Sequence, residues 1–278
     1  MYLITFGGLN DTINQIMHAF NYCKKYKRLL VVNSTQSRLE MPIQNYFDMQ
    51  NNNLYYKSLD EFLLFSEKLT KFPNINLNQL KIFYDIEEKK TLLNNKLYDL
   101  NLKKRYEEDI FIYANKRMNG TKTKDFFILF NMKKEIINII KERYKKLPKD
   151  YISVHIRNTD YKSNVPLFVE KNKMFFKDKN IFLATDNKDS KNYFINEVQA
   201  NIFTFTDLPE YNSDVANGIH KFKTEKKDEI NKDSISDLVL LSLGKEIFTS
   251  SENSGFSKNA IIMQNNLQCK QKILSQIN

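Results

Sequence analysis

The sequence predicts an α/β protein built on parallel sheets. Short apolar runs typical of strands alternate with helical segments, and this alternation favours parallel strands joined by helices. Hydrophobic residues make up 41% of the chain and aromatic residues 13%, which is the composition of a folded protein despite the many lysines and asparagines. With 278 residues, the chain has the length of two domains of about 140 residues each.

The first elements form the opening of a β-α-β unit. They are a strand over residues 3–6, a helix over 12–26 and a second strand over 29–32. Gly7 and Gly8 follow the first strand, where they fit either a plain tight turn or a site of close backbone approach. Residues 34–125 mix short apolar segments with Lys- and Asn-rich connections, and we expect them to complete the first domain.

The second half of the chain continues the alternation. A stripe of isoleucines predicts a helix over 132–147 that ends at Pro148. The expected elements after it are strands over 151–157, 181–186, 200–205 and 246–251 and helices over 190–198 and 234–243. The charged segment 221–233 is expected to be an exposed loop or a solvated helical turn. The predicted domains are therefore 1–147 and 148–278.

Charge and cysteine content narrow the classes of protein. The 43 Lys+Arg against 33 Asp+Glu favour an anionic partner: nucleic acid, an anionic lipid surface or a phosphorylated small molecule. No apolar run reaches the ~18 residues of a membrane span, and the N-terminus lacks signal-peptide features. We expect a cytoplasmic protein, with peripheral contact at the inner face of an anionic membrane left open. Cys23 and Cys269 are not spaced for a disulfide framework or a zinc site.

Polar side chains follow three of the expected strands. In YISVHIRNTDY (151–161), one face of the strand is apolar while the other carries His155 and Arg157. The next strand ends in Thr-Asp at 185–186, and the last ends in Thr-Ser-Ser at 249–251. Because ligands bind beyond the carboxyl ends of parallel strands, we expect one polar ligand site at this edge.

Several of these residues have two readings. Arg157 can present two parallel donors to a phosphate, or it can form a structural salt bridge with Asp160. A single histidine in a strand, His155, is more often a packed residue than a ligand. Ser254 and its neighbours fit a phosphate site at a helix start, and they fit N-capping of that helix equally well.

Four stretches resemble the α1,2-/α1,6-/protein O-fucosyltransferase superfamily. They are GGLND (7–11), the H-x-R-x-T-D motif in HIRNTD (155–160), the strand end TD (185–186), and FTSSENSGFSKNA (248–260) after an apolar helix. H-x-R-x-T-D is the most specific and is closest to the α1,6 branch, whereas ENSGFSKNA is closer to the α1,2 branch. The chain is therefore similar to a divergent, bacterial-type member, over residues 1–35 and 148–265.

The resemblance implies an α/β fold of the GT-B glycosyltransferase type, with two Rossmann-like domains facing across a cleft. Residues 1–147 would form the acceptor-side domain, and 148–278 the domain that binds the nucleotide sugar. The implied activity is inverting, metal-independent transfer of fucose from GDP-fucose to a hydroxyl of a cell-surface glycan. The implied partners are a GDP-sugar donor and a glycan acceptor; no cofactor, metal or nucleic acid is implied.

The resemblance assigns the reacting end of the donor to Arg157, which would neutralise the β-phosphate as the leaving group departs. The α1,6 enzymes carry a candidate glutamate base five residues past the motif aspartate, where this chain has Val165. Asp160 and Asp11 are the candidates for that base. Asp160 fits equally well as an acceptor that holds Arg157.

The resemblance also assigns the nucleotide. His155 would contact it, and Asp237 matches a carboxylate that accepts the N1–H and amino group of guanine. The spacing Ser234-x-x-Asp237 also fits a capping box, and Asp233 is the fallback. Asn10 matches an asparagine near the transferred sugar. The other positions expected to bind substrate are Gly8, Asp11, Thr159, Asp186, Ser254, Phe256 and Ser257.

Two other functions stay open on the sequence. One is a glycosyltransferase that uses another nucleotide sugar, and the choice depends on whether Asp237 reads guanine. The other is a non-catalytic, basic protein that binds nucleotides or nucleic acid. It ranks lower because the chain has no RNP-like aromatic motif and no basic helix with base-reading spacing.

Overall fold

The computed structural model consists of two compact units, Met1–Asn131 (unit 1) and Met132–Asn278 (unit 2). It describes residues 1–49, 59–85, 90–115, 121–210, 212, 216, 218, 219, 222 and 224–278. The units divide just before helix α4 (Lys134–Lys145), so the helix expected to close the first domain belongs to unit 2. The roles of the two domains, and the cleft expected between them, stay predictions.

Unit 1 is built on a parallel sheet in the strand order β2-β1-β8-β4. Its strands are β1 (Tyr2–Ile4), β2 (Val31–Asn33), β4 (Lys71–Phe72) and β8 (Ile110–Tyr113). Leu3 lies opposite Val32 on one side and Tyr113 on the other. Strands β1 and β8 are buried throughout, as expected for a parallel sheet covered on both faces. With α1 (Leu9–Tyr26) between β1 and β2, the predicted β-α-β opening is confirmed.

The rest of unit 1 contains short elements that the sequence pattern did not place. They are η1 (Ile43–Asn45), β3 (Phe47–Asp48), α2 (Leu59–Ser66), η2 (Leu77–Gln79), β5 (Ile82–Asp85), β6 (Lys90–Leu93), β7 (Lys96–Leu97), α3 (Thr123–Leu129) and β9 (Asn131–Met132). Strands β5, β6 and β7 form an antiparallel sheet, and β3 pairs with β9. The second half of the predicted first domain is therefore not a simple continuation of the β-α-β pattern.

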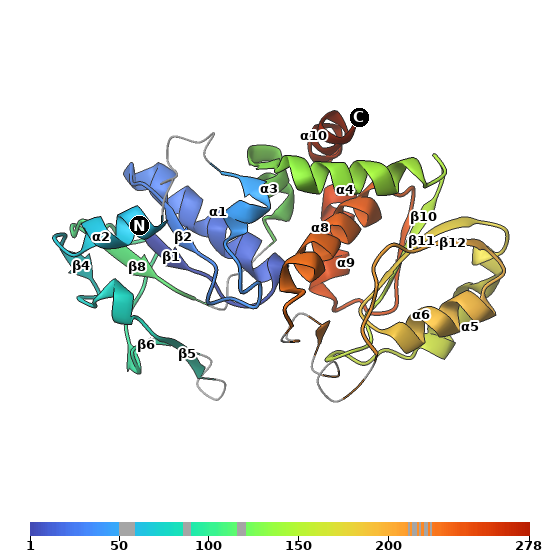
Figure 1. Cartoon of the computed structure of the whole chain (residues 1–278), viewed down its shortest axis with the longest axis horizontal. Helices are drawn as coiled ribbons and strands as arrows, with labels where there is room; N and C mark the ends of the chain where they lie inside the picture. The colour runs from blue at the N-terminus through green and yellow to red at the C-terminus, as the bar shows by residue number, and fades with distance from the viewer. Residues whose placement is uncertain are drawn as a thin grey trace. The chain divides into compact units, whose positions relative to one another are not determined.

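Unit 2 is a parallel sheet in the strand order β12-β11-β10-β13. The strands are β10 (Ile152–Ile156), β11 (Asn180–Thr185), β12 (Asn201–Phe203) and β13 (Ile247–Thr249). In the described part of unit 2, the helices besides α4 are α5 (Val165–Phe176), α6 (Lys188–Glu197), α8 (Lys227–Leu243), α9 (Gly255–Gln264) and α10 (Leu267–Ile277). Helices α5 and α6 lie on one side of the sheet, and α4 and α8 lie on the other (Figure 1). The prediction of parallel strands joined by helices is confirmed.

Strand β10 is buried on both faces. It has a neighbour on each side, β11 and β13, and all five of its residues are buried. Alternation correctly predicted a strand here, but the polar face of Ser153 and His155 does not meet solvent. A central strand of a covered parallel sheet is enclosed by helices on both sides, so its polar residues need partners within the protein.

Two elements of unit 2 differ from expectation. Segment 221–233 was expected to be an exposed loop or a solvated helical turn; Lys227–Asp233 are helical, but they begin the long helix α8 and Lys227 is buried. The continuity of this helix was missed because α8 has almost no amphipathic pattern and its apolar run begins only at Ile235. Helix α5 was not predicted; Asn164 caps it by accepting from the Leu167 N–H.

Within the described ranges, no helix has both the length and the apolar character needed to cross a membrane.

Candidate active site

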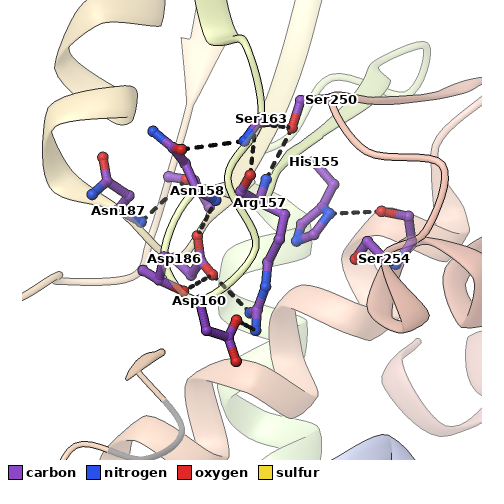
Figure 2. A network of polar contacts seen from close by, with 12 residues as sticks. His155, Arg157, Asn158, Asp160, Ser163, Asp186, Asn187, Ser250 and Ser254 are labelled. Carbon is purple, nitrogen blue, oxygen red and sulfur yellow. Dashed lines mark hydrogen bonds and ion pairs between the residues drawn. The ribbon is translucent and has the colours of Figure 1, made fainter. Parts of the chain in front are cut away.

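The candidate site lies at the carboxyl edge of the unit 2 sheet. Because the four strands are parallel, the segments that follow them meet at one edge. Arg157 follows β10, Asp186 follows β11 and Ser250 follows β13. Figure 2 shows these residues converging, with Asp160 beside the Arg157 guanidinium. The expectation that the three polar strand ends share one edge is confirmed by the sheet order.

Arg157 is held between two carboxylates. Its Nη1 lies 2.7 Å from Asp186 Oδ2, and its Nη2 lies 2.5 Å from Asp160 Oδ1. The arginine side chain is 19% exposed, so it retains a face toward solvent. The salt bridge with Asp160 that the sequence allowed is present, and Asp186 adds a second. These ion pairs fix the direction of the guanidinium and still leave some of its five N–H donors for an anion.

Asp186 organises the loop that follows β10. It accepts hydrogen bonds from the Asn158 N–H at 2.8 Å and from the Thr159 hydroxyl at 2.5 Å, in addition to the Arg157 ion pair. Burial raises the pKa of Asp186, while Arg157 and these two donors oppose the rise. Thr159 is 1% exposed, so in this structure both Thr159 and Asp186 support the loop from inside the protein.

Serine hydroxyls hold the backbone of Arg157. The Ser250 hydroxyl accepts from the Arg157 N–H at 3.0 Å, and the Ser163 hydroxyl donates to the Arg157 carbonyl at 2.6 Å. The two hydroxyls are 3.0 Å apart, so they form one connected group (Figure 2). Sequence reasoning noted the polar run that contains Ser250, but no pattern marked Ser163.

Asn158 joins the same network from the other side. Its side-chain amide donates to the Ser190 hydroxyl at 2.9 Å, and Asn187 caps α6 by accepting from the Ser190 N–H at 2.7 Å. Sequence reasoning included Asn158 in the polar run after the strand without giving it a role, and it did not select Asn187 or Ser190. The available signal was an asparagine three residues before the predicted helix start at 190, since asparagine is a typical N-cap.

His155 is buried behind the guanidinium. It is 4% exposed, its Nδ1 lies 2.7 Å from the Ser257 hydroxyl, and its ring centroid lies 5.2 Å from that of Phe256. Burial, and secondarily the charge of Arg157, lowers the pKa of His155 to about 3, so the ring is neutral at ordinary pH. The packed-residue reading of His155 therefore describes its surroundings well.

Helix α9 brings the second motif to the same edge. Ser254 is the N-cap, and its hydroxyl accepts from the Ser257 N–H at 3.5 Å. The Ser257 hydroxyl also lies 2.8 Å from that of Thr249 at the end of β13. Phe256 lies against the ring of His155 in β10. The three residues matched to this motif therefore contact β10 (Phe256), contact the end of β13 (Ser257) or cap α9 (Ser254).

Asp237 lies on α8 in a separate polar cluster of unit 2. Its Oδ2 accepts from the Thr206 hydroxyl at 2.8 Å, and its Oδ1 is buried without a hydrogen-bond partner among the described residues. Burial raises the pKa of Asp237 to about 7. Asp237 is not an N-terminal capping residue, because α8 begins at Lys227, so the capping-box reading with Ser234 is wrong. Asp233, the alternative candidate for binding guanine, forms an ion pair with Arg143.

Gly8, Asn10 and Asp11 belong to unit 1. Gly8 is the N-cap of α1, and its N–H donates to Asp11 Oδ2 at 3.3 Å. Gly7 has a φ of 74°, and a Cβ there would lie 2.1 Å from Asp11 Oδ2, so the turn requires glycine. Asn10 Oδ1 is buried with no hydrogen-bond partner in the described part of unit 1.

Two further findings bear on the chemistry. Among the residues that the structure describes, no group of three or more His, Cys, Asp or Glu could hold a metal ion. Val165 is the buried first residue of α5 and offers no proton acceptor. The position where the resemblance expects a base therefore carries no side-chain proton acceptor.

The fold described above is similar to that of a known class of proteins. Its mixed α/β fold with parallel sheets matches the GT-B fold of glycosyltransferases. No family model and no curated protein matches the sequence.

Among solved structures, the neighbours include NodZ alpha-1,6-fucosyltransferase. NodZ co-crystallised with GDP is 16% identical, with a TM-score of 0.64 over 94% of this chain and 91% of that one. NodZ soaked with GDP-fucose is 15% identical, with a TM-score of 0.63 over 93% of this chain and 91% of that one. The structure of NodZ from Bradyrhizobium is 15% identical, with a TM-score of 0.64 over 93% and 91%. At this identity the likeness establishes the fold.

Proposed function

We propose that this protein is an inverting fucosyltransferase that transfers fucose from GDP-fucose to a hydroxyl of a cell-surface glycan without a metal. One observation carries the proposal. An arginine fixed by two carboxylates stands at the carboxyl edge of a parallel sheet, within the fold of an enzyme crystallised with GDP and with GDP-fucose. The H-x-R-x-T-D motif, which places Arg157 there, supports the same superfamily and a divergent, bacterial-type member of it.

In this reaction Arg157 acts on the leaving group. The acceptor oxygen forms a bond to C1 of fucose from the face opposite the diphosphate, and the bond between C1 and the β-phosphate oxygen breaks. Negative charge then grows on GDP, and a guanidinium held in place stabilises it without reorganising. Asp186 and Asp160 supply that fixed orientation through their ion pairs.

The acceptor hydroxyl must lose its proton to a base. Asp160 is the candidate in unit 2, since its side chain is 24% exposed and it lies at the edge of the site. Its ion pair with Arg157 also gives it a positioning role. Asp11 is the candidate in unit 1, where it accepts from the Gly8 N–H at the start of α1. Asn10, whose Oδ1 has no hydrogen-bond partner in the described unit, is assigned to the transferred sugar.

The nucleotide is assigned to the same edge of unit 2. The Asp237 carboxylate would accept the N1–H and the amino group of guanine, and its Oδ1 has no hydrogen-bond partner within the described residues. A carboxylate in this place favours guanine over adenine or uracil. Ser254, Phe256, Ser257 and His155 would line the path between the base and the diphosphate.

Calorimetric titration tests the proposal directly. The protein is titrated with GDP, ADP, UDP and CMP in buffer containing EDTA, and turnover is then measured with GDP-fucose and GDP-mannose. We expect binding selective for GDP in EDTA and transfer from GDP-fucose. Selective binding of UDP or ADP would indicate a glycosyltransferase that uses another nucleotide sugar. Salt-dependent binding to RNA with no nucleotide selectivity would favour a nucleic-acid-binding protein.

A further inference from the structure

A second polar cluster lies in unit 2, between helices α4 and α8. Asp233 and Asp237 are four residues apart, so they lie on the same face of α8, and Arg143 reaches them from the last turn of α4. Arg143 Nη2 donates to Asp233 Oδ1, and Thr206 donates to Asp237 Oδ2. The cluster therefore fixes one side of the guanidinium and one oxygen of the Asp237 carboxylate.

Two facing atoms of this cluster, Arg143 Nη1 and Asp237 Oδ1, form a long ion pair but make no hydrogen bond with each other. Arg143 Nη1 and Asp237 Oδ1 are both buried, and neither has a hydrogen-bond partner among the described residues. They are 3.9 Å apart, which is too far for a hydrogen bond between them. A buried polar atom without a hydrogen bond costs about 1–3 kcal/mol, so a donor and an acceptor that face each other at ion-pair distance leave room for a ligand that hydrogen-bonds to both.

We propose that Arg143 and Asp237 together read the edge of the guanine base, with Arg143 Nη1 donating to O6 and Asp237 Oδ1 accepting from N1–H. This inference rests on the proposed function, because it assumes a GDP-linked donor, and it assigns a new specificity-determining residue, Arg143.

The chemistry of the bases supports this pairing. Guanine presents the O6 acceptor next to the N1–H and 2-amino donors, whereas adenine presents a 6-amino donor next to an N1 acceptor. Adenine would therefore place a donor against Arg143 and an acceptor against Asp237. A buried site built for hydrogen bonds rejects a ligand that leaves its groups unpaired, since water cannot take the missing place.

The surroundings of Arg143 also fit a nucleotide site. Phe205 lies below the guanidinium, with its ring centroid 5.8 Å from Arg143 Cζ, and it stacks on Phe182 of β11. Phe205 and Thr206 follow β12, so they enter the cluster from the chain beyond the carboxyl end of that strand. A base that reaches the pair must displace the side chains that shield it from solvent.

The test compares how protein variants bind three nucleotides: GDP, IDP and 6-thio-GDP. IDP lacks the 2-amino group, and 6-thio-GDP replaces O6 with a poor acceptor while keeping N1–H. For wild-type protein we expect 6-thio-GDP to bind about 10- to 100-fold more weakly than GDP, the range for one hydrogen bond to a charged group. In Arg143→Met the ratio of the Kd for 6-thio-GDP to the Kd for GDP should fall to near one. The ratio of the Kd for IDP to the Kd for GDP should stay as in the wild-type protein.

Two controls keep the test decisive. Arg105→Met removes an arginine that is 67% exposed in unit 1 and should change neither ratio. Arg143→Lys retains the charge but cannot reach Asp233 and O6 together, so its Kd ratio for 6-thio-GDP over GDP should also fall. This variant provides the test if Arg143→Met does not fold. If wild-type protein binds no guanine nucleotide, the proposed function fails and the inference fails with it. If GDP binds selectively and both Arg143 variants keep the wild-type ratio, the inference alone is overturned.

Discussion

Methionine in place of Arg157 removes the guanidinium that joins Asp160 and Asp186, and two effects must then be separated. Asp186 has a side-chain exposure of 6%, so the substitution leaves a buried carboxylate without this counter-ion. Breaking a buried pair in this way costs about 3–5 kcal/mol of unfolding free energy. A loss of activity in this variant alone would therefore not distinguish chemistry from folding.

A second substitution resolves the ambiguity. Asp186→Asn keeps an oxygen that can accept from the Asn158 N–H or the Thr159 hydroxyl, so we expect a smaller loss of about 1–2 kcal/mol. The double variant Arg157→Met/Asp186→Asn has no buried carboxylate at position 186, and Asp160, which also loses the guanidinium, is 24% exposed and keeps contact with solvent. It should be more stable than Arg157→Met, because an ion pair replaced by neutral groups is often close to neutral in stability. Guanidinium chloride unfolding measures all three variants.

Activity then reports on the guanidinium itself. If Arg157 stabilises the leaving diphosphate, the double variant should lose about 10²- to 10³-fold in kcat even though it is folded. Asp186→Asn keeps the guanidinium and its ion pair with Asp160, so it should retain far more turnover of GDP-fucose. A folded double variant that turns over within about tenfold of Asp186→Asn would refute the phosphate role of Arg157.

Three further predictions follow from single residues. Burial raises the pKa of Asp237 from 3.8 in the unfolded chain to about 7 in the folded protein, so the unfolded chain releases this proton at lower pH. Between these two pKa values, the free energy of unfolding therefore falls as the pH rises. GDP binding should strengthen over the upper part of this range, because the carboxylate forms there. Titrations at about pH 6, 7 and 8 check this, and Asp237→Asn should abolish both trends. Gly7→Ala should destabilise by about 1–2 kcal/mol in thermal unfolding because φ is 74°, whereas Gly255→Ala, with open space around its Cβ, should not; equal effects would contradict the turn argument. His155 should show no NMR titration between about pH 5 and 8, since its pKa is lowered to about 3; an inflection near 6.5 would mean that it is not buried in solution.

The site could be anticipated where local pattern and sheet topology agree. Alternation predicted β10, and the parallel-sheet rule alone placed Arg157 and Asp186 at one edge. Burial of both faces of β10 could not be read from alternation, because it depends on which helices cover the sheet. The start of α8 was missed for a related reason: its first turns are charged in sequence, and Lys227 becomes buried only through tertiary packing.

Residues that act through long-range contacts left little local signal. Ser163 touches the site because the loop after β10 folds back on Arg157, and serine is common in any loop. Arg143 is one of several basic residues near the end of α4, and its position facing α8 singles it out. The antiparallel strands β5, β6 and β7 were missed because the middle of the chain lacks clear periodicity.

The serine contacts to the backbone of Arg157 have a thermodynamic consequence. Its N–H and carbonyl are both engaged by hydroxyls, from Ser250 and Ser163, just where β10 leaves the sheet. The main chain that carries the guanidinium is thus ordered when the protein folds, so little of its freedom is lost when an anion arrives. Binding of a diphosphate there should carry a small conformational-entropy penalty, and affinity should depend mainly on how well the anion competes with Asp160 and Asp186.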